Sequence, residues 1–219
     1  MPVIAIDGPA AAGKGAVARA LAETLKFHYL DSGKIYRAAA AEALARKISP
    51  DDEDAVRRIA ENLSPDNIFS RPGLDLPETG AAASRLARLE AVREIFLPLQ
   101  RGFRRFPGLV ADGRDMGSAV FPDAALKVFL TADIGIRAER RRKQLQERGI
   151  HATIASVLAD LQQRDKQDST RAGSPLAVLP GAFVMDSSRR EIGCIAAELA
   201  RRFADARPFF HPAQEDLKI

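Results

Sequence analysis

The stretch GPAAAGKGA at residues 8–16 constrains the fold of this chain most, because only Asp7 separates it from the apolar run VIAI at residues 3–6. Its Gly8, Gly13 and Lys14 match the phosphate-binding pattern G-x-x-x-x-G-K. In that pattern, inward-pointing backbone N–H groups, a helix N-terminus and the lysine surround an anion. Because good helix formers follow the loop, the sequence predicts a buried strand, a phosphate-binding loop and a helix.

The loop lacks the hydroxyl that usually follows its lysine, since Gly15 occupies that position and Ala16 comes next. A hydrogen bond to a charged group contributes about 1.5–3 kcal/mol, so its loss weakens nucleotide binding without abolishing it. Mg²⁺ commonly keeps several water ligands and needs few protein groups. Asp31 and Asp112, each placed just after an apolar stretch, are the candidate carboxylates to hold Mg²⁺ through water.

Apolar runs and helix-forming stretches alternate along the rest of the chain, which favours a parallel sheet with helices on both faces. Further strands are expected at residues 109–112, 125–130 and 183–186. Helices are expected at residues 16–25, 33–47, 54–63, 81–106, 133–148, 153–171 and 191–206. Pro98 is expected to break or bend the longest helix. The proline-rich stretch at 64–80 is interpreted as an irregular or short-stranded insert.

Composition restricts the possible classes of protein. Of the 219 residues, 46% are hydrophobic, which is enough for one domain with a core. No apolar stretch approaches the roughly 20 residues of a membrane span. The single Cys194 excludes an intrachain disulfide, and the three scattered histidines provide no zinc-binding spacing. We therefore expect a cytoplasmic, monomeric protein without a membrane partner.

The net charge of +4 raises the question of which anion the basic residues bind. Five cations crowd the predicted helix at 133–148, namely Arg137, Arg140, Arg141, Arg142 and Lys143. Polyphosphate and RNA both fit such a cluster, but aromatic residues are only 6% and are not interleaved with the basic ones, which disfavours RNA. A regulatory GTPase is disfavoured too, because neither Asn62 nor Asn67 is followed by the lysine of an N-K-x-D motif.

Two motifs indicate a second anion site that faces the loop. The run DGRD at residues 112–115 ends the predicted strand at 109–112, and α/β sheets bind ligands at the carboxyl ends of their strands. Arg37 lies four residues after Gly33 and one turn into a predicted helix, where it could clamp a phosphate. A kinase for a small phosphorylated acceptor would need such a second site.

The predicted helix at 153–171 carries an independent signal. Its core-facing stripe is expected to consist of Ile154, Val157, Leu158 and Leu161. In steps of three and four residues, the same face continues into Arg164, Asp168 and Arg171. A face that begins apolar and ends charged has to leave the core and meet a polar ligand or a polar surface.

Several motifs together resemble the bacterial cytidylate kinase family. They are IDGP at 6–9, LDSG with IYR at 30–37, ADGRDMG with VFPD at 111–123, and RD…D…R…PL between residues 164 and 176. Their order and spacing extend from about residue 3 to residue 190. The resemblance implies a P-loop kinase core at 1–63 and 81–219, a helical lid at about 137–173, and an insert at 64–80 that binds the nucleoside monophosphate (NMP).

The resemblance also implies the reaction, in which the γ-phosphoryl group of ATP moves to CMP or dCMP with Mg²⁺ as the metal. ATP would bind Gly8, Pro9, Ala10, Ala11, Ala12, Gly13, Lys14, Gly15 and Ala16. CMP would contact Ser32, Tyr36, Arg37, Ser84, Arg93, Arg114, Asp115, Arg164, Asp168 and Arg171. The catalytic charges would come from Lys14, Arg137, Arg141 and Arg171.

This chain departs from the family pattern at Ala16, Asp75 and Gln167. Two alternatives therefore stay open at this point. One is a kinase for another nucleoside monophosphate such as UMP, and the other is a P-loop module that binds RNA without turnover.

Overall fold

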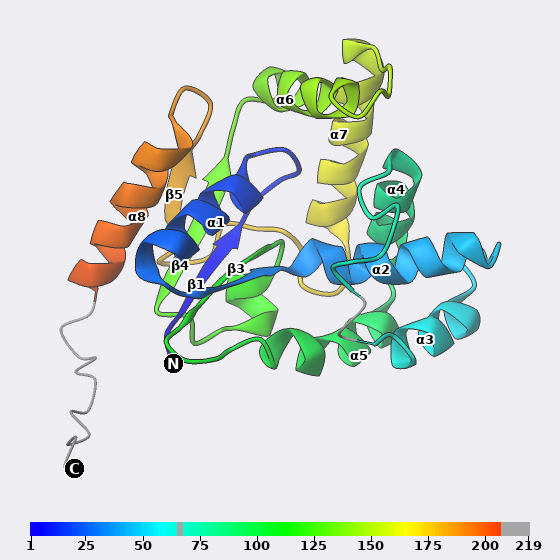
Figure 1. Cartoon of the computed structure of the whole chain (residues 1–219), viewed down its shortest axis with the longest axis horizontal. Coiled ribbons are helices and arrows are strands. Elements are labelled where there is room, and N and C mark those ends of the chain that lie inside the picture. The colour runs from blue at the N-terminus through cyan, green and yellow to red at the C-terminus, as the bar shows by residue number, and fades with distance from the viewer. Residues whose placement is uncertain (65–67, 207–219) are drawn as a thin grey trace.

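The structure, a computed structural model, describes residues 1–64 and 68–206. A parallel five-stranded sheet in the order β2-β3-β1-β4-β5 lies at its centre, which confirms the expected α/β fold (Figure 1). The strands are β1 (Val3–Asp7), β2 (His28–Asp31), β3 (Leu109–Gly113), β4 (Leu126–Thr131) and β5 (Phe183–Asp186).

The central strand β1 is buried on both faces, which explains why its sequence is apolar without alternation. Val3 and Ala5 enter the core on one face of the sheet, whereas Ile4 and Ile6 enter the core on the other. The strand carries its only charge, Asp7, at the carboxyl end, directly before the phosphate-binding loop.

Helices cover both faces of the sheet (Figure 1). The face of Ile4 and Ile6 is covered by α1 (Lys14–Leu25) and α8 (Ile192–Asp205), which pack against each other. The opposite core is built with α2 (Ser32–Ala45), α3 (Glu53–Glu61), α4 (Pro77–Leu86) and α5 (Glu90–Arg101). Beyond the carboxyl ends of the strands, α6 (Ile134–Gln146) and α7 (Ile154–Thr170) rise above the sheet (Figure 1).

The prediction of one long helix at 81–106 is wrong about where the helix starts and where the chain breaks it. The structure has two helices, because α4 already begins at Pro77 and ends at Leu86, before α5 starts at Glu90. Pro77 fits the first turn of α4, where a backbone N–H is unpaired in any case. Pro98 lies inside α5 without ending it, because it removes only one helical hydrogen bond.

Two further elements were not expected from the sequence. The strand β2 is half polar, and only Leu30 is fully buried in it, so no apolar run marks it. A π-helix, η2 (Met116–Val120), follows β3, where we expected no helix. Within the described part of the predicted insert, residues 68–76 form turns and no strand, and residues 65–67 lie outside the description, as does the tail at 207–219.

Candidate active site

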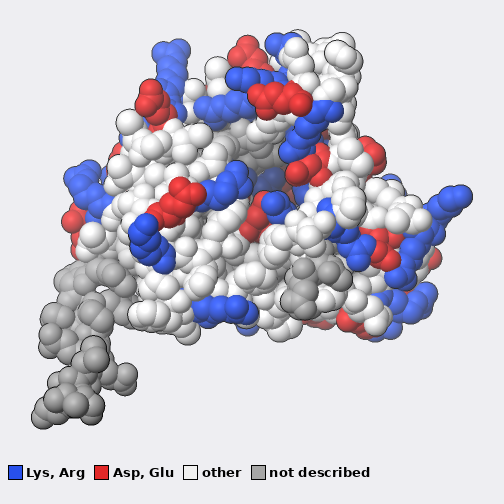
Figure 2. Space-filling model, viewed as in Figure 1, with Lys and Arg blue, Asp and Glu red and all other residues white. Residues whose placement is uncertain are grey.

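The carboxyl ends of β1, β2 and β3 meet at one cavity of about 590 Å³. Parallel register places Asp7 beside Gly113 and Asp31 beside Asp112 at this edge. The surface view shows a hollow below α6, with basic and acidic side chains around it (Figure 2). The strands thus deliver charged residues, which are distant in sequence, to the place where α/β sheets bind ligands.

The phosphate-binding loop folds tightly on one side of this cavity. A Cβ at Gly8 would lie 1.9 Å from the Leu130 carbonyl oxygen, and Gly13 has a φ of +90°, so both positions require glycine. Lys14 Nζ donates to the Pro9 carbonyl oxygen at 2.8 Å. Six of the nine predicted ATP contacts line the cavity, namely Ala10, Ala11, Gly13, Lys14, Gly15 and Ala16, whereas Gly8, Pro9 and Ala12 are outside its described lining.

Lys14 and Asp112 form a buried pair of opposite charges at the base of the cavity. Burial, with Arg114 beside it, lowers the pKa of Lys14 to about 7. Burial, with Asp31 beside it, raises the pKa of Asp112 above its ordinary value. Because removal from water disfavours both charged groups, the pair would gain from a polyphosphate and a cation.

The two carboxylates considered for Mg²⁺ lie on neighbouring strands, since Asp31 pairs with Asp112 in the register of β2 and β3. Both line the cavity. Tyr29 Oη donates to Asp112 Oδ1 at 3.0 Å, and Ser32 Oγ donates to the Asp112 carbonyl oxygen at 2.8 Å. In the part of the chain that the structure describes, no three acidic, histidine or cysteine side chains cluster as metal ligands. Two oxygen donors fit a cation that keeps its water.

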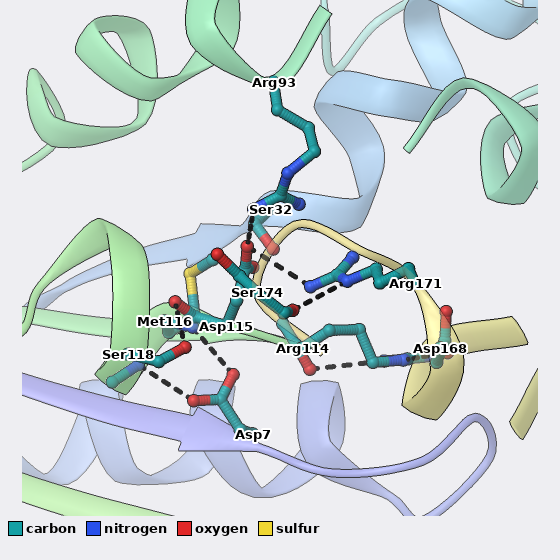
Figure 3. A network of polar contacts seen from close by, with 12 residues as sticks. Asp7, Ser32, Arg93, Arg114, Asp115, Met116, Ser118, Asp168, Arg171 and Ser174 are labelled. Carbon is teal, nitrogen blue, oxygen red and sulfur yellow. Dashed lines mark hydrogen bonds and ion pairs between the residues drawn. The ribbon is translucent and has the colours of Figure 1, made fainter. Parts of the chain in front are cut away.

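A network of ion pairs forms the opposite wall (Figure 3). Asp115 accepts from Arg93 at 2.6 Å and lies 3.3 Å from Arg171 Nη2. Arg114 Nε donates to Asp168 at 2.6 Å. Among the described residues, Arg171 Nη2 is buried without a partner in hydrogen-bond geometry, while Arg171 Nε donates to the Ser174 carbonyl oxygen at 2.7 Å. A buried guanidinium with an unused donor is typical of a site that receives an anion.

Asp7 supports this wall from below (Figure 3). Its carboxylate accepts hydrogen bonds from the backbone N–H groups of Met116 and Gly117, both at 2.8 Å. Burial raises the pKa of Asp7, although the two backbone donors lower it. The last residue before the phosphate-binding loop therefore fixes the turn that carries Asp115.

Three arginines with few acidic partners face one another near α4. Burial is the main cause that lowers the pKa of Arg37 to about 10, and the positive charges of Arg141 and Arg164 lower it further. Arg37 donates to the Leu74 carbonyl oxygen, and Arg164 pairs with Asp160. Gly80 makes room for them, since a Cβ there would lie 3.1 Å from Arg37 and 3.3 Å from Arg164. Like charges held this close favour an anion between them.

The remaining predicted acceptor residues also line the cavity. Tyr36 packs edge-to-face on Phe96 with ring centroids 5.1 Å apart, and burial raises the pKa of its hydroxyl. Ser84 lies on α4, where its hydroxyl donates to the Gly80 carbonyl oxygen. The structure thus brings all ten predicted CMP contacts to one cavity.

The predicted lid arginines take different positions. Arg141 lines the cavity, but Arg137 is buried away from the described lining and bonds to Asp165 and to the carbonyl oxygens of Ala10 and Ala132. Arg140 donates to Ser187. On α7, Val157 and Leu161 are buried as expected. Ile154 is 45% exposed because it is the first residue of the helix, so the expected core stripe is wrong there.

A sequence model of the family described as cytidylate kinase matches residues 4–205. That match covers more than half of the chain, including every charged group of the cavity described above. The chain belongs to the cytidylate kinase family. A curated cytidylate kinase from Nitrosomonas eutropha is 42% identical, and the match covers 94% of this chain and 96% of the relative's chain. The cytidylate kinase of Bordetella pertussis is 48% identical over 85% of this chain and 88% of its own.

Sequence reasoning missed four residues that line the cavity, namely Arg19, Lys34, Gln144 and Arg148. It also missed Tyr29, which donates to the lining residue Asp112. Arg19 could have been found, because it lies one helical turn after Gly15 on the same face of α1. Arg148 could not, because its partner Asp75 lies 73 residues away, where it accepts from Arg148 at 3.1 Å. No helix in the described residues is both long and apolar enough to cross a bilayer.

Proposed function

We propose that this protein transfers the γ-phosphoryl group of ATP to CMP or dCMP, with Mg²⁺ as the metal. The observation that carries the proposal is the pairing of two anion sites in one cavity. Lys14 and the loop line one side, whereas Arg37, Arg164 and Arg171 line the other. A donor polyphosphate and an acceptor phosphate would both be held, and holding two reactants in place accounts for much of phosphoryl-transfer catalysis.

The reaction needs no general base. An ionised oxygen of the acceptor phosphate forms the new bond to the γ-phosphorus, while the bond from that phosphorus to the β,γ-bridging oxygen breaks and ADP leaves with the electron pair. Lys14, Arg141 and Arg171 would offset the charge of the transferring group. Arg171 has the donor for this role, because its buried Nη2 makes no hydrogen bond to the described residues and only pairs with the Asp115 carboxylate at 3.3 Å.

Mg²⁺ fits the carboxyl edge of β2 and β3, where Asp31 and Asp112 supply hard oxygen donors side by side. The metal would supply positive charge to the β- and γ-phosphate oxygens. Because this chain has no hydroxyl at positions 15 or 16, the two carboxylates would hold the ion through its water ligands.

Recognition of cytosine is assigned to Asp115, Arg93 and Ser84. A carboxylate accepts a hydrogen bond from the N4 amino group of cytosine. Uracil carries a carbonyl oxygen at that position, which the carboxylate would repel. Arg93 holds Asp115 at 2.6 Å and so fixes its direction. Closure of the lid at 137–173 and of the insert at 64–80 over the core would exclude water from the bound ATP.

The experiment is a coupled assay of ADP formation with CMP, dCMP, UMP and AMP as acceptors. We expect turnover with CMP and dCMP, and at least tenfold lower kcat/KM with UMP and AMP. Preferred turnover with UMP or AMP would reassign the acceptor. Salt-dependent binding of RNA without any phosphoryl transfer would overturn the proposed function. We place the reaction in the reducing cytoplasm, in line with the one cysteine, Cys194, which is free. The active species is proposed to be a monomer.

A further inference from the structure

Arg137 is the one predicted catalytic residue that lies outside the described lining of the cavity. Its side chain is 7% exposed and is held by three segments of the chain. Nε donates to the Ala132 carbonyl oxygen at 3.0 Å, and Nη1 donates to the Ala10 carbonyl oxygen at 3.2 Å. Nη1 also lies 2.7 Å from Asp165 Oδ2 of α7. A guanidinium fixed at three points is not free to reach a phosphate in the cavity.

The contact with Ala10 sets the direction of one N–H group of the phosphate-binding loop. In a planar trans peptide, the carbonyl of one residue and the N–H of the next point in opposite directions. Because the Ala10 carbonyl is directed at Arg137, the Ala11 N–H is directed away from it. Within the residues that the structure describes, that N–H has no acceptor, and Ala11 lines the cavity. Arg137 thus leaves a backbone donor available to a phosphate oxygen.

Ala11 has a backbone conformation that alanine rarely adopts, since its φ is +59°. Such a conformation persists only where the surrounding contacts fix it. Ala10 and Ala11 pack against the apolar cluster of the two lid helices, which includes Ala138 and Leu161. Apolar packing has no preferred direction, so the hydrogen bond from Arg137 supplies the directional contact that orients this peptide.

Asp165 fixes Arg137 in turn. Its Oδ2 pairs with Arg137, while its Oδ1 is buried and makes no hydrogen bond to the described residues. Burial lowers the pKa of Arg114, but the carboxylates of Asp168 and Asp165 raise it, so Asp165 also acts on the acceptor wall. The effect of Asp165 through Arg137 is therefore measured separately from its effect through Arg114.

We propose that Arg137 is a positioning residue, held by Asp165, that orients the phosphate-binding loop for ATP without touching the nucleotide. The inference rests on the proposed function, since ATP is the ligand of the loop. A role through the loop and a role at the phosphates predict opposite effects of Asp165. If Arg137 had to reach a phosphate, Asp165 would compete for it, and loss of that carboxylate would tighten ATP binding. If Arg137 acts through Ala10, the same loss weakens ATP binding.

The first test is the Kd for ATP of Asp165→Asn, measured by calorimetry in EDTA. Asparagine keeps the size of the side chain and loses its charge, so binding should weaken about fivefold. Unchanged or tighter binding of ATP would overturn the proposal.

The second test shows whether Asp165 acts through Arg137. Arg137→Gln should bind ATP about tenfold more weakly, and Arg137→Gln/Asp165→Asn should stay within about twofold of Arg137→Gln, because one contact is lost in both. About fiftyfold weaker binding by the double variant, the product of the single effects, would contradict this coupling. The double variant leaves neither charge buried alone, so its tenfold loss against the unmodified protein carries the test if Arg137→Gln does not fold.

Arg104→Gln is the matched control, because Arg104 also donates to a carbonyl oxygen, that of Met1, and pairs with a carboxylate, that of Asp123, outside the described lining of the cavity. Its Kd for ATP should not change. The Kd for CMP of Arg137→Gln should stay within about threefold, and equal weakening of CMP and ATP binding would show that Arg137 only supports the fold. ATP binding needs no acceptor, so a failure of CMP phosphorylation by the unmodified protein is seen separately.

Discussion

At the scale of single residues, the site depends on charged groups that are buried and are paired through hydrogen bonds or ion pairs. Asp7 accepts two backbone hydrogen bonds, and Lys14 donates to the Pro9 carbonyl oxygen. Asp115 accepts a hydrogen bond from Arg93. Burial of such groups costs free energy unless each one has a partner. Each contact therefore has a measurable consequence of its own.

Asp7→Ala should lower the free energy of unfolding by about 2–4 kcal/mol, because it leaves the buried N–H groups of Met116 and Gly117 without acceptors. Urea denaturation measures this change. Asp123→Ala is the control, since Asp123 is an exposed carboxylate paired with Arg104, and its loss should cost less than about 1 kcal/mol. Equal losses in the two variants would contradict the role of Asp7.

ATP binding should take up a proton at Lys14. Burial lowers its pKa to about 7, so at pH 8 the amine is mostly neutral in the unbound protein. The terminal phosphate, with a pKa of about 6, is already ionised at that pH. A bound polyphosphate favours the cationic amine, raises its pKa, and draws in close to one proton.

Calorimetry at pH 8 in EDTA, with buffers of different ionisation enthalpy, measures this uptake. Lys14→Arg should show a much smaller uptake, because a guanidinium stays protonated at that pH and only Asp112, whose pKa burial also raises, can then gain a proton. A binding enthalpy that does not depend on the buffer in the unmodified protein would refute the lowered pKa of Lys14.

At the scale of elements, α4 brings together two arginines that we propose for the acceptor, because it packs on α2 and its Gly80 lies against both Arg37 and Arg164. The sequence could not show this. No glycine or proline marks the break between α4 and α5, and the contact of Gly80 with the two arginines joins residues far apart in the chain. Strands with continuous apolar runs were predictable, since burial on both faces leaves a local pattern.

Gly80→Ala separates helix stability from acceptor binding. Alanine favours the helix by up to about 1 kcal/mol, so the free energy of unfolding should stay equal or rise. The new Cβ would displace the guanidinium groups of Arg37 and Arg164, and the KM for CMP should rise about fivefold while the KM for ATP stays constant.

Gly193→Ala in α8 is the control for this substitution, because a Cβ there would meet nothing within 4 Å. It should leave both KM values unchanged. An unchanged KM for CMP in Gly80→Ala would mean that the two arginines do not hold the acceptor.

At the scale of the whole molecule, the fold brings the basic residues of two separate motifs, proposed as two anion sites, to one cavity. Charged side chains surround its opening (Figure 2). The ten residues that the family resemblance assigns to the acceptor all line this cavity, although Ser84 and Arg93 belong to none of the motifs or helix faces that the sequence shows. The sequence did not predict the contacts of Asp7 with η2 or of Tyr29 with Asp112, which span 109, 110 and 83 residues. Only the parallel register of β1, β2 and β3 brings these groups together.

The most direct test of the paired anion sites is the turnover of ATP with CMP by Arg171→Ala. We expect kcat to fall about 10³-fold or more, because a charge at the transferring group is lost, while the Kd for ATP stays within about threefold. The same assay should give CDP with the unmodified protein. Normal turnover by Arg171→Ala would contradict the account, since Arg171 would then not serve the phosphoryl group that passes between the two sites.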